Sequence, residues 1–466
     1  MSSRSRTTGV FTAVAVGVGV CGGIGVVWLA QDLHASVDGD QARLAAAQVS
    51  TATPAPTIEL KYATGAPDAA LLTPHTDIAN MTPAEQRIAA LSMSRTTNKK
   101  LGSNVAVEVT DVDSGRIVWS HNGKRLMMPA SNLKLLTAAH ALDTMGVKKR
   151  FTTRVVQVAP GHIAIVGAGD PALDQFSVKQ LADRVAKQLK AKGQTGKTKV
   201  SVDLSRYPTP TNGNGWPKAT MPWTARPVVP LAMTGYMGKD PAKDTANVLA
   251  KQLSEDGITA SYGGRVRTTA SNATVASFQG RDLRSVVKYM LQTSDNNTAE
   301  MLGRESAIAT GFAPTWAGAQ KAIVAYMDSI GLDHRGQTIM DSSGLSRKNR
   351  VSSVLLNTIL LMAHNKAAHP ELSVIYTDGL PVSGKSGTLS SGSDRFVTKD
   401  TKCAVGKVRA KTGSLEDVIG LSGYAQGADG KQKAFSILVN QRPKKYWIVD
   451  ARQQLDRIAA TIVGCF

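Results

Sequence analysis

The stretch PASNLKLLTAAHALDTMG, residues 129–146, begins an expected helix and carries an S-x-x-K pattern at Ser131 and Lys134. Residues three apart share one face of a helix, so the Lys134 amine can reach the Ser131 hydroxyl. A serine hydroxyl needs a base before it attacks a carbonyl, and an amine is a base only when it is neutral. Burial among the neighbouring leucines would lower the pKa of Lys134. The stretch therefore predicts a nucleophile, Ser131, beside its own base.

Two further short motifs follow in an order that completes a known set. Residues 294–296 read SDN, an S-x-N motif, and residues 411–413 read KTG. Each motif alone is weak, but the three in this order are typical of penicillin-binding proteins and class A β-lactamases. A second cation at Lys411 would lower the pKa of Lys134 further. The set predicts acyl transfer through a serine.

Other copies of these motifs fit the chemistry less well. Ser285 and Lys288 repeat S-x-x-K, but the apolar side chains of their helix define a different face, so both are expected to face water. Residues 120–122 repeat S-x-N inside a hairpin turn. Residues 385–387, KSG, could replace KTG. Residues 411–413 are preferred because they end an extended run and precede the alternating VIGLSGYA, as the edge of a sheet requires.

The octapeptide GLPVSGKS, residues 379–386, matches the phosphate-binding pattern G-x-x-x-x-G-K-[ST]. A phosphate loop needs an entering strand and a departing helix. Residues 372–377, LSVIYT, could supply the strand, but GTLSSGSDRF follows the match and has the composition of a loop. A nucleotide hydrolase is therefore disfavoured.

Three other classes of site lack their signatures. The chain has no G-x-S-x-G, and none of its eight histidines lies in a recognisable catalytic motif. It has no C-x-x-C or H-E-x-x-H, so we expect no metal and no cofactor. The net charge of +20 favours anionic partners, such as an acidic envelope polymer, or simply solubility. The basic residues are scattered and not interleaved with aromatic ones, so nucleic acid is not an expected partner.

The N-terminus predicts export. Arg4 and Arg6 precede an uncharged, largely apolar run from Thr7 to Gln31. Positive charge before such a run keeps the N-terminus in the cytoplasm and places the rest outside. The run is long enough to span a bilayer. We expect a signal-anchor or a cleaved signal peptide, and thus an extracytoplasmic protein of the cell envelope that is membrane-anchored or secreted.

The pattern along the chain predicts four parts. Residues 1–31 form the signal-anchor or signal peptide, and residues 32–80, rich in Ala, Thr, Ser and Pro, form a flexible stalk. Residues 81–150 and 276–466 form the catalytic domain. Residues 151–275 form a domain inserted between the first and second motifs.

Longer blocks around these motifs carry a family resemblance. They are PASNLK, GAGDPAL, TSDNNTAEML, DSSGLSRKNRVS, LPVSGKSGTL and VRAKTGSL. In these blocks the chain resembles the class C low-molecular-mass penicillin-binding proteins, which are D-alanyl-D-alanine carboxypeptidases and endopeptidases. The resemblance covers roughly residues 82–463. It implies an α/β (α+β) β-lactamase/DD-peptidase-like fold, with an antiparallel sheet flanked by helices, a helical subdomain and an inserted domain.

The resemblance also implies a role for each motif residue. Ser131 attacks the carbonyl between two D-alanines, and Lys134 takes its proton. Ser294 relays a proton to the leaving amine, Asn296 binds the peptide backbone of the substrate, and Lys411 sets the local field. Substrate binding falls to Thr412, Gly413 and Ser414, of which Thr412 and Ser414 hold the terminal carboxylate. The amides of Ser131 and Ser414 form the oxyanion hole. The partners implied are peptidoglycan stem peptides and β-lactam antibiotics.

Two cysteines and two rival functions complete the expectations. Cys403 and Cys465 are the cysteines outside the N-terminal run, and in an oxidising compartment they form either a disulfide or two buried thiols.

One rival function is a β-lactamase, disfavoured by the long insert. The other is a catalytically silent wall-binding module, disfavoured by the intact motifs.

Overall fold

The computed structural model describes residues 81–208, 213–217, 224–236 and 238–465. The expected signal segment, residues 1–31, and the stalk, residues 32–80, lie outside the described residues. Within the described part of the chain, no helix combines the length and the apolar character needed to cross a bilayer.

An antiparallel sheet of five strands is assembled from the two ends of the described chain, in the order β2-β1-β10-β9-β8. Strands β1 and β2 precede the S-x-x-K motif in the chain, whereas β8, β9 and β10 follow the S-x-N motif. The sheet therefore joins segments that lie far apart in the sequence. The strands are β1 (Val105–Asp111), β2 (Ile117–His121), β8 (Val408–Ser414), β9 (Ile419–Gln426) and β10 (Gln432–Val439).

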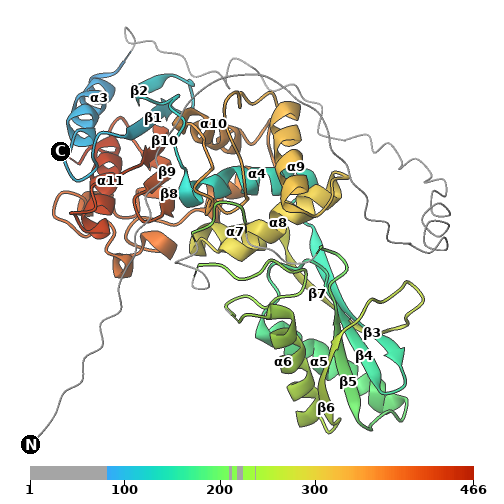
Figure 1. Cartoon of the computed structure of the whole chain (residues 1–466). Helices are drawn as coiled ribbons and strands as arrows, with labels where there is room; N and C mark the ends of the chain where they lie inside the picture. The colour runs from blue at the N-terminus through green and yellow to red at the C-terminus, as the bar shows by residue number, and fades with distance from the viewer. Residues whose placement is uncertain (1–80, 209–212, 218–223, 237, 466) are drawn as a thin grey trace, which may run out of the picture. The chain divides into compact units, whose positions relative to one another are not determined.

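Both faces of this sheet are covered because its strands are apolar on both sides. In β1, Val105, Val107 and Val109 face α3 (Pro83–Thr96) and α11 (Ile448–Val463), as expected from the two-residue period of a strand. On the other face, α4 (Lys134–Met145) and α10 (Ser353–His364) pack in a second core. Figure 1 shows α3 and α11 on one side of the sheet and α10 on the other.

The helical segment that carries the S-x-N motif is interrupted at that motif. It forms α7 (Leu283–Thr293) and α8 (Asn296–Ala309), and α9 (Trp316–Ser329) follows. Ser294 ends α7 in the left-handed conformation, with φ of 62°, and the Asp295 carboxylate caps α8 by accepting the Thr298 amide at 2.7 Å. The break points Ser294 and Asn296 in directions that a continuous helix would not allow.

A second sheet of five strands, in the order β6-β5-β4-β3-β7, is built between the first and second motifs. It is mixed: β3 pairs antiparallel with β4 and β7, whereas β4, β5 and β6 run parallel. Helices α5 and α6 pack on it in a core of its own. The elements are β3 (Arg150–Ala159), β4 (His162–Val166), α5 (Gln175–Ala191), β5 (Thr198–Asp203), α6 (Pro241–Glu255), β6 (Ala260–Arg265) and β7 (Thr274–Asp282).

The two sheets and their helices confirm the predicted mixed α/β fold class. The exact domain boundaries stay a prediction. Residues 372–377 do not form the strand considered above, because Leu372, Val374 and Ile375 turn inward to the helical core, and Ile375–Gly379 is a short π-helix.

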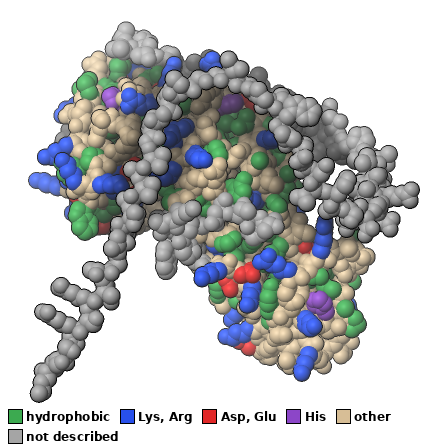
Figure 2. Space-filling view, in the orientation of Figure 1, with side chains coloured by type: hydrophobic (Ala, Val, Ile, Leu, Met, Phe, Trp, Pro, Cys, Tyr) green, Lys and Arg blue, Asp and Glu red, His purple; other side chains and the backbone are tan. Residues whose placement is uncertain are grey.

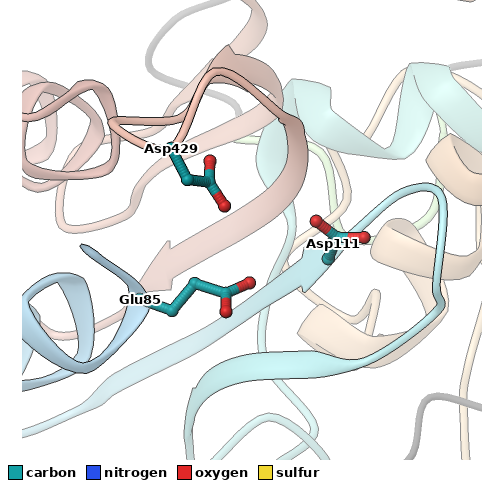
Figure 3. Close-up of side chains that lie close together, drawn as sticks. All are labelled: Glu85, Asp111 and Asp429. Atoms are coloured by element: carbon teal, nitrogen blue, oxygen red, sulfur yellow. The ribbon is translucent and has the colours of Figure 1, made fainter. Parts of the chain in front are cut away.

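A buried ionic cluster joins the start of α3 to the central sheet. Glu85, Asp111 and Asp429 point toward one another (Figure 3) with the Lys433 ammonium between them, at 3.2, 2.6 and 2.7 Å respectively. Burial opposes charge on Lys433, but hydrogen bonds to Asp111 and Asp429 outweigh it and raise the pKa of Lys433. Because the ammonium supplies the positive charge for these carboxylates, the cluster is an ion-pair network and not a metal site.

We expect Lys433→Met to destabilise the protein by about 3–5 kcal/mol, because it leaves Asp111 and Asp429 without their counter-charge, whereas Glu85 keeps Arg116 at 2.7 Å. Urea unfolding of the full chain measures this loss. Lys431→Met is the matched control: Lys431 is exposed two residues away, and its replacement should change stability by less than about 0.5 kcal/mol. A loss of similar size in both variants would contradict the assignment.

Candidate active site

The three motifs meet at one cavity of about 630 Å³. Ser131 lies in a 3₁₀ turn, η2 (Ala130–Leu133), immediately before α4. Ser294 and Asn296 lie at the α7–α8 break, and Thr412 and Ser414 lie at the end of β8. The cavity is lined by Ser131, Pro217, Thr224, Ser294, Asn296, Leu345, Arg347, Thr388, Ser393, Arg395, Thr412, Ser414, Leu415, Glu416, Ile448 and Arg452.

The amine of Lys134 makes hydrogen bonds to three other residues of the site. Its Nζ donates to Ser131 Oγ at 3.0 Å, to Asn296 Oδ1 at 2.7 Å and to the carbonyl oxygen of Ser343 at 2.7 Å. Three acceptors match the three protons of an ammonium. When the amine is neutral it retains two donors and one lone pair, and the contact with Ser131 is the one through which it can accept a proton. The S-x-x-K spacing thus produces the predicted pair.

Burial lowers the pKa of Lys134 to about 8, although the charges of Asp341, Asp295 and Glu300 oppose the shift. A substantial fraction of this amine is therefore neutral near physiological pH, as a general base requires. Burial is the cause, as the sequence suggested, whereas the charge of Lys411, the second expected cause, does not contribute to the shift of this pKa.

Lys411 is fully buried on β8, and its Nζ donates to Ser294 Oγ at 2.9 Å and to the carbonyl oxygen of Thr412 at 2.8 Å. Burial and, secondarily, the charge of Lys134 lower the pKa of Lys411 well below its usual value. Both lysines are buried, and the charge of Lys134 disfavours the charged form of Lys411. Each lysine contacts one serine at the cavity: Lys134 contacts Ser131, and Lys411 contacts Ser294.

Two non-glycine residues with positive φ lie at the site. Ala130, which precedes Ser131, has φ of 46°, and Ser294 has φ of 62°. Non-glycine residues rarely occupy this region, and strained residues cluster at active sites. Gly344 packs against the same turn: a Cβ there would lie 1.9 Å from the carbonyl oxygen of Ala130. The loop that carries Ser343 therefore approaches the Ser131 turn as closely as only glycine permits.

The end of β8 presents hydroxyl groups to the cavity. Thr412 Oγ1 donates to Thr388 Oγ1 at 2.8 Å, and Ser414 Oγ donates to the carbonyl oxygen of Gly413 at 2.8 Å. A Cβ on Gly413 would lie 2.5 Å from Asn132 Nδ2, so Gly413 lets β8 pack directly on the turn of Ser131. Gly413 thus has a packing role in addition to its predicted place in the substrate-binding motif.

The motifs did not reveal Glu300, a buried carboxylate that acts on Lys134 through the Ser343 backbone. Glu300 lies one turn after Asn296 on α8 and is fully buried. Its Oε1 accepts the amides of Ser342 at 3.1 Å and Ser343 at 2.8 Å, which orients the Ser343 carbonyl toward Lys134. Burial raises the pKa of Glu300 to about 7. An acidic residue four positions after the motif asparagine was the available signal.

Asp341 organises the rest of this loop. Its Oδ1 accepts from the Gly344 amide at 2.9 Å and from Asn349 Nδ2 at 2.8 Å, and its Oδ2 accepts from the Ser346 amide at 2.7 Å and from Trp216 Nε1 at 2.8 Å. Sequence reasoning did not identify this residue either. The position of the Ser343 carbonyl therefore depends on two buried carboxylates.

We expect Glu300→Gln to move the acidic limb of the pH–activity profile to lower pH. Glutamine keeps an oxygen for the two amides but removes the charge that favours the ammonium form of Lys134, so the pKa of Lys134 falls, by up to about one unit. The measurement is kcat/KM against pH. Glu305→Gln on the same helix, whose carboxylate contacts Arg206 and Tyr207, is the control and should leave the limb in place. An unmoved limb in Glu300→Gln would count against this coupling.

The alternative motifs lie elsewhere. Lys288 pairs with Asp378 at 3.2 Å, Ser120 contacts Glu108, and Lys385 is exposed. None of the cavity-lining residues among those described is a histidine. Between Ser386 and β8 the only helical elements among the described residues are short 3₁₀ turns, so the phosphate-loop match lacks its helix.

Cys403 and Cys465 form a disulfide, with Cα atoms 6.1 Å apart, that ties the end of the described chain to the segment before β8.

The comparisons with known proteins agree with this geometry. The family model described as D-Ala-D-Ala carboxypeptidase 3 (S13) matches residues 87–237 and 234–462. The chain is 30% identical to the Carboxypeptidase DacB of Mycolicibacterium smegmatis over 416 residues, which cover 84% of this chain and 86% of that protein.

Solved structures show the same fold. Penicillin binding protein 4 (dacB) from Haemophilus influenzae superposes with a TM-score of 0.66 at 20% identity, over 80% of this chain and 98% of that chain. The same protein complexed with a β-lactam superposes with a TM-score of 0.60, at the same identity and coverage.

Proposed function

The chain belongs to the D-Ala-D-Ala carboxypeptidase 3 (S13) family and is a serine-type, penicillin-binding D-Ala-D-Ala carboxypeptidase, and from this premise we propose that Ser131 is its nucleophile, that peptidoglycan stem peptides are its substrates and that it works outside the cytoplasm. The observation that supports the assignment of Ser131 is the contact of its hydroxyl with the buried Lys134 amine at 3.0 Å, in the cavity that Ser294 and Asn296 also line.

The reaction begins when neutral Lys134 removes the proton of Ser131 and Oγ attacks the carbonyl carbon between the two D-alanines. The C–N bond then breaks, and the proton that Lys134 accepted passes to the leaving amine of the last D-alanine through Ser294, whose Oγ accepts a hydrogen bond from Lys411 Nζ. Lys134 is then neutral again. Water later hydrolyses the ester on Ser131 and frees the shortened peptide. The amine of Lys134 serves as base in both halves.

The remaining motif residues bind and orient the substrate. Asn296 accepts from Lys134 through Oδ1 and donates through Nδ2 to the carbonyl oxygen of Thr224 at 2.6 Å, so its amide is held at the cavity wall beside the substrate backbone. Thr412 and Ser414 present hydroxyls for the terminal carboxylate. The amides of Ser131 and Ser414 stabilise the oxyanion, and losing one such donor typically costs about 10²–10³ in rate.

A β-lactam presents the same groups as the substrate, a reactive carbonyl beside a carboxylate, and acylates the same serine. The Haemophilus influenzae relative has been solved with a β-lactam, which supports this extension to Ser131. Slow hydrolysis of the ester would leave Ser131 blocked. A β-lactamase would release the product quickly, and a silent wall-binding module would not be acylated.

The location outside the cytoplasm is supported by the sequence of residues 1–31 and by the pairing of Cys403 with Cys465, since disulfides persist in oxidising compartments. Figure 2 shows many Lys and Arg side chains on the visible face, which suits an anionic cell wall. The N-terminal segment attaches the protein to the membrane or is removed on secretion. Protease added to intact spheroplasts should digest the protein, and protection from protease would place it in the cytoplasm.

The test of the function uses the full chain, a peptide ending in D-Ala-D-Ala and a fluorescent penicillin. We expect release of one D-alanine per peptide and a stable covalent label that survives denaturation. Rapid loss of the label with turnover of free penicillin would indicate a β-lactamase. The absence of both label and D-alanine release would indicate a binding module.

A further inference from the structure

We propose that Arg452, on α11, is the cationic partner of the free carboxylate of the substrate and makes the enzyme selective for a residue that carries one. The inference deepens the proposed function and rests on it. Arg452 lies outside the three motifs, and its side chain lines the same cavity as Ser131.

Arg452 differs from the other charged side chains that line the cavity. Arg347 pairs with Asp417 at 2.7 Å, and Glu416 pairs with Lys444 at 2.5 Å. The Nε of Arg395 donates to both carboxylate oxygens of Asp456 at 3.0 Å. Within the described residues, none of the ion pairs includes Arg452.

The position of Arg452 fits this role. Its Nε donates to Ser414 Oγ at 3.2 Å, at the end of β8 where the motif hydroxyls lie. Ile448, one turn earlier on α11, also lines the cavity, so this face of α11 forms part of the wall. Neither of its two Nη groups donates a hydrogen bond to another described residue, and an arginine can use these groups to bind a carboxylate in a bidentate pair.

The surroundings of Arg452 leave its charge uncompensated. Burial lowers the pKa of Arg452, the positive charges of Arg395 and Arg442 lower it further, and Asp456 only partly opposes them. A half-buried cation repelled by its neighbours gains more from an arriving anion than an exposed or paired cation does. The ligand class that fits is a small molecule with a carboxylate one residue beyond the scissile carbonyl, which is a C-terminal D-amino acid or the carboxylate of a bicyclic β-lactam.

The experiment compares acid and neutral forms of the same ligand in the full chain. Peptides ending in D-Ala-D-Ala and in the corresponding C-terminal amide are one pair, and benzylpenicillin and its methyl ester are the other. For Arg452→Met we expect kcat/KM for the acid peptide and the acylation rate with benzylpenicillin to fall roughly 10- to 100-fold. The neutral forms should change less than about twofold, so the preference for the acid largely disappears. Arg452→Lys should restore part of that preference.

Arg457→Met is the matched control, because Arg457 is on the same helix but pairs with Asp400 outside the cavity. It should preserve the preference for the acid. Equal losses on acid and neutral ligands in Arg452→Met would show a structural role only and overturn the inference, as would an unchanged preference. If Arg452→Met folds poorly, Arg452→Lys still tests the role of Arg452, because acylation of Ser131 by benzylpenicillin and by its methyl ester can be compared in that variant. Absence of any labelling in the wild-type chain would instead refute the proposed function itself.

Discussion

Ser131→Ala should reduce D-alanine release by at least about 10⁴-fold and abolish covalent labelling by penicillin. The hydroxyl is the atom that forms the acyl-enzyme, and no other described serine contacts Lys134 through its side chain. Removing a catalytic serine from comparable hydrolases costs factors of this size, and the residual rate comes from binding and the oxyanion hole. The measurements are D-alanine release and in-gel fluorescence.

The other S-x-x-K serine supplies the matched control. Ser285 is held at the start of α7, where its amide donates to the Asp282 carboxylate at 3.0 Å, away from the cavity. Ser285→Ala should label and turn over like the wild type. Label that persists in Ser131→Ala and disappears in Ser285→Ala would move the nucleophile and refute the site described here.

Lys134→Met should lower the acylation rate by about 10²–10⁴-fold, because general-base catalysis contributes that range. Methionine is unbranched and nearly fills the buried space, so the change removes mainly the amine. It also leaves Asn296 Oδ1 and the Ser343 carbonyl without their donor. Stopped-flow acylation by a chromogenic β-lactam measures the effect, and urea unfolding separates it from any loss of stability.

The pH profile distinguishes a base from a merely structural lysine. Wild-type acylation should rise with pH through about 8 as Lys134 loses its proton. In Lys134→Met that limb should vanish, leaving a low rate that does not depend on this group. Lys288→Met, the lysine of the other S-x-x-K, is exposed to solvent and paired with Asp378, and should keep both rate and limb. A limb retained in Lys134→Met would assign the titration to another residue, with Lys411 the first to examine.

The sequence predicted that the three motifs meet, and it could do so because each motif is short. Ser131 and Lys134 are three residues apart at one helix start, a spacing that allows their side chains to meet, and they do so at 3.0 Å. The same locality explains why the phosphate-loop match was rejected correctly. The left-handed turn at Ser294 could not be predicted in this way, because helical periodicity does not register the hydrogen bond that Ser294 accepts from Lys411 on β8.

By itself, the sequence determined which chemical groups are available, their local spacing and the family to which they belong. Only the tertiary structure decided which distant groups support them. Glu300 and Asp341 orient the Ser343 carbonyl toward Lys134, and Arg452 reaches Ser414 from the last helix. The physical reason is that helix and strand periods relate residues a few positions apart. Groups far apart in the chain meet only where packing of the apolar faces of α4, α8, α11 and the central sheet brings them together, and the same packing excludes the water that would otherwise keep Lys134 charged.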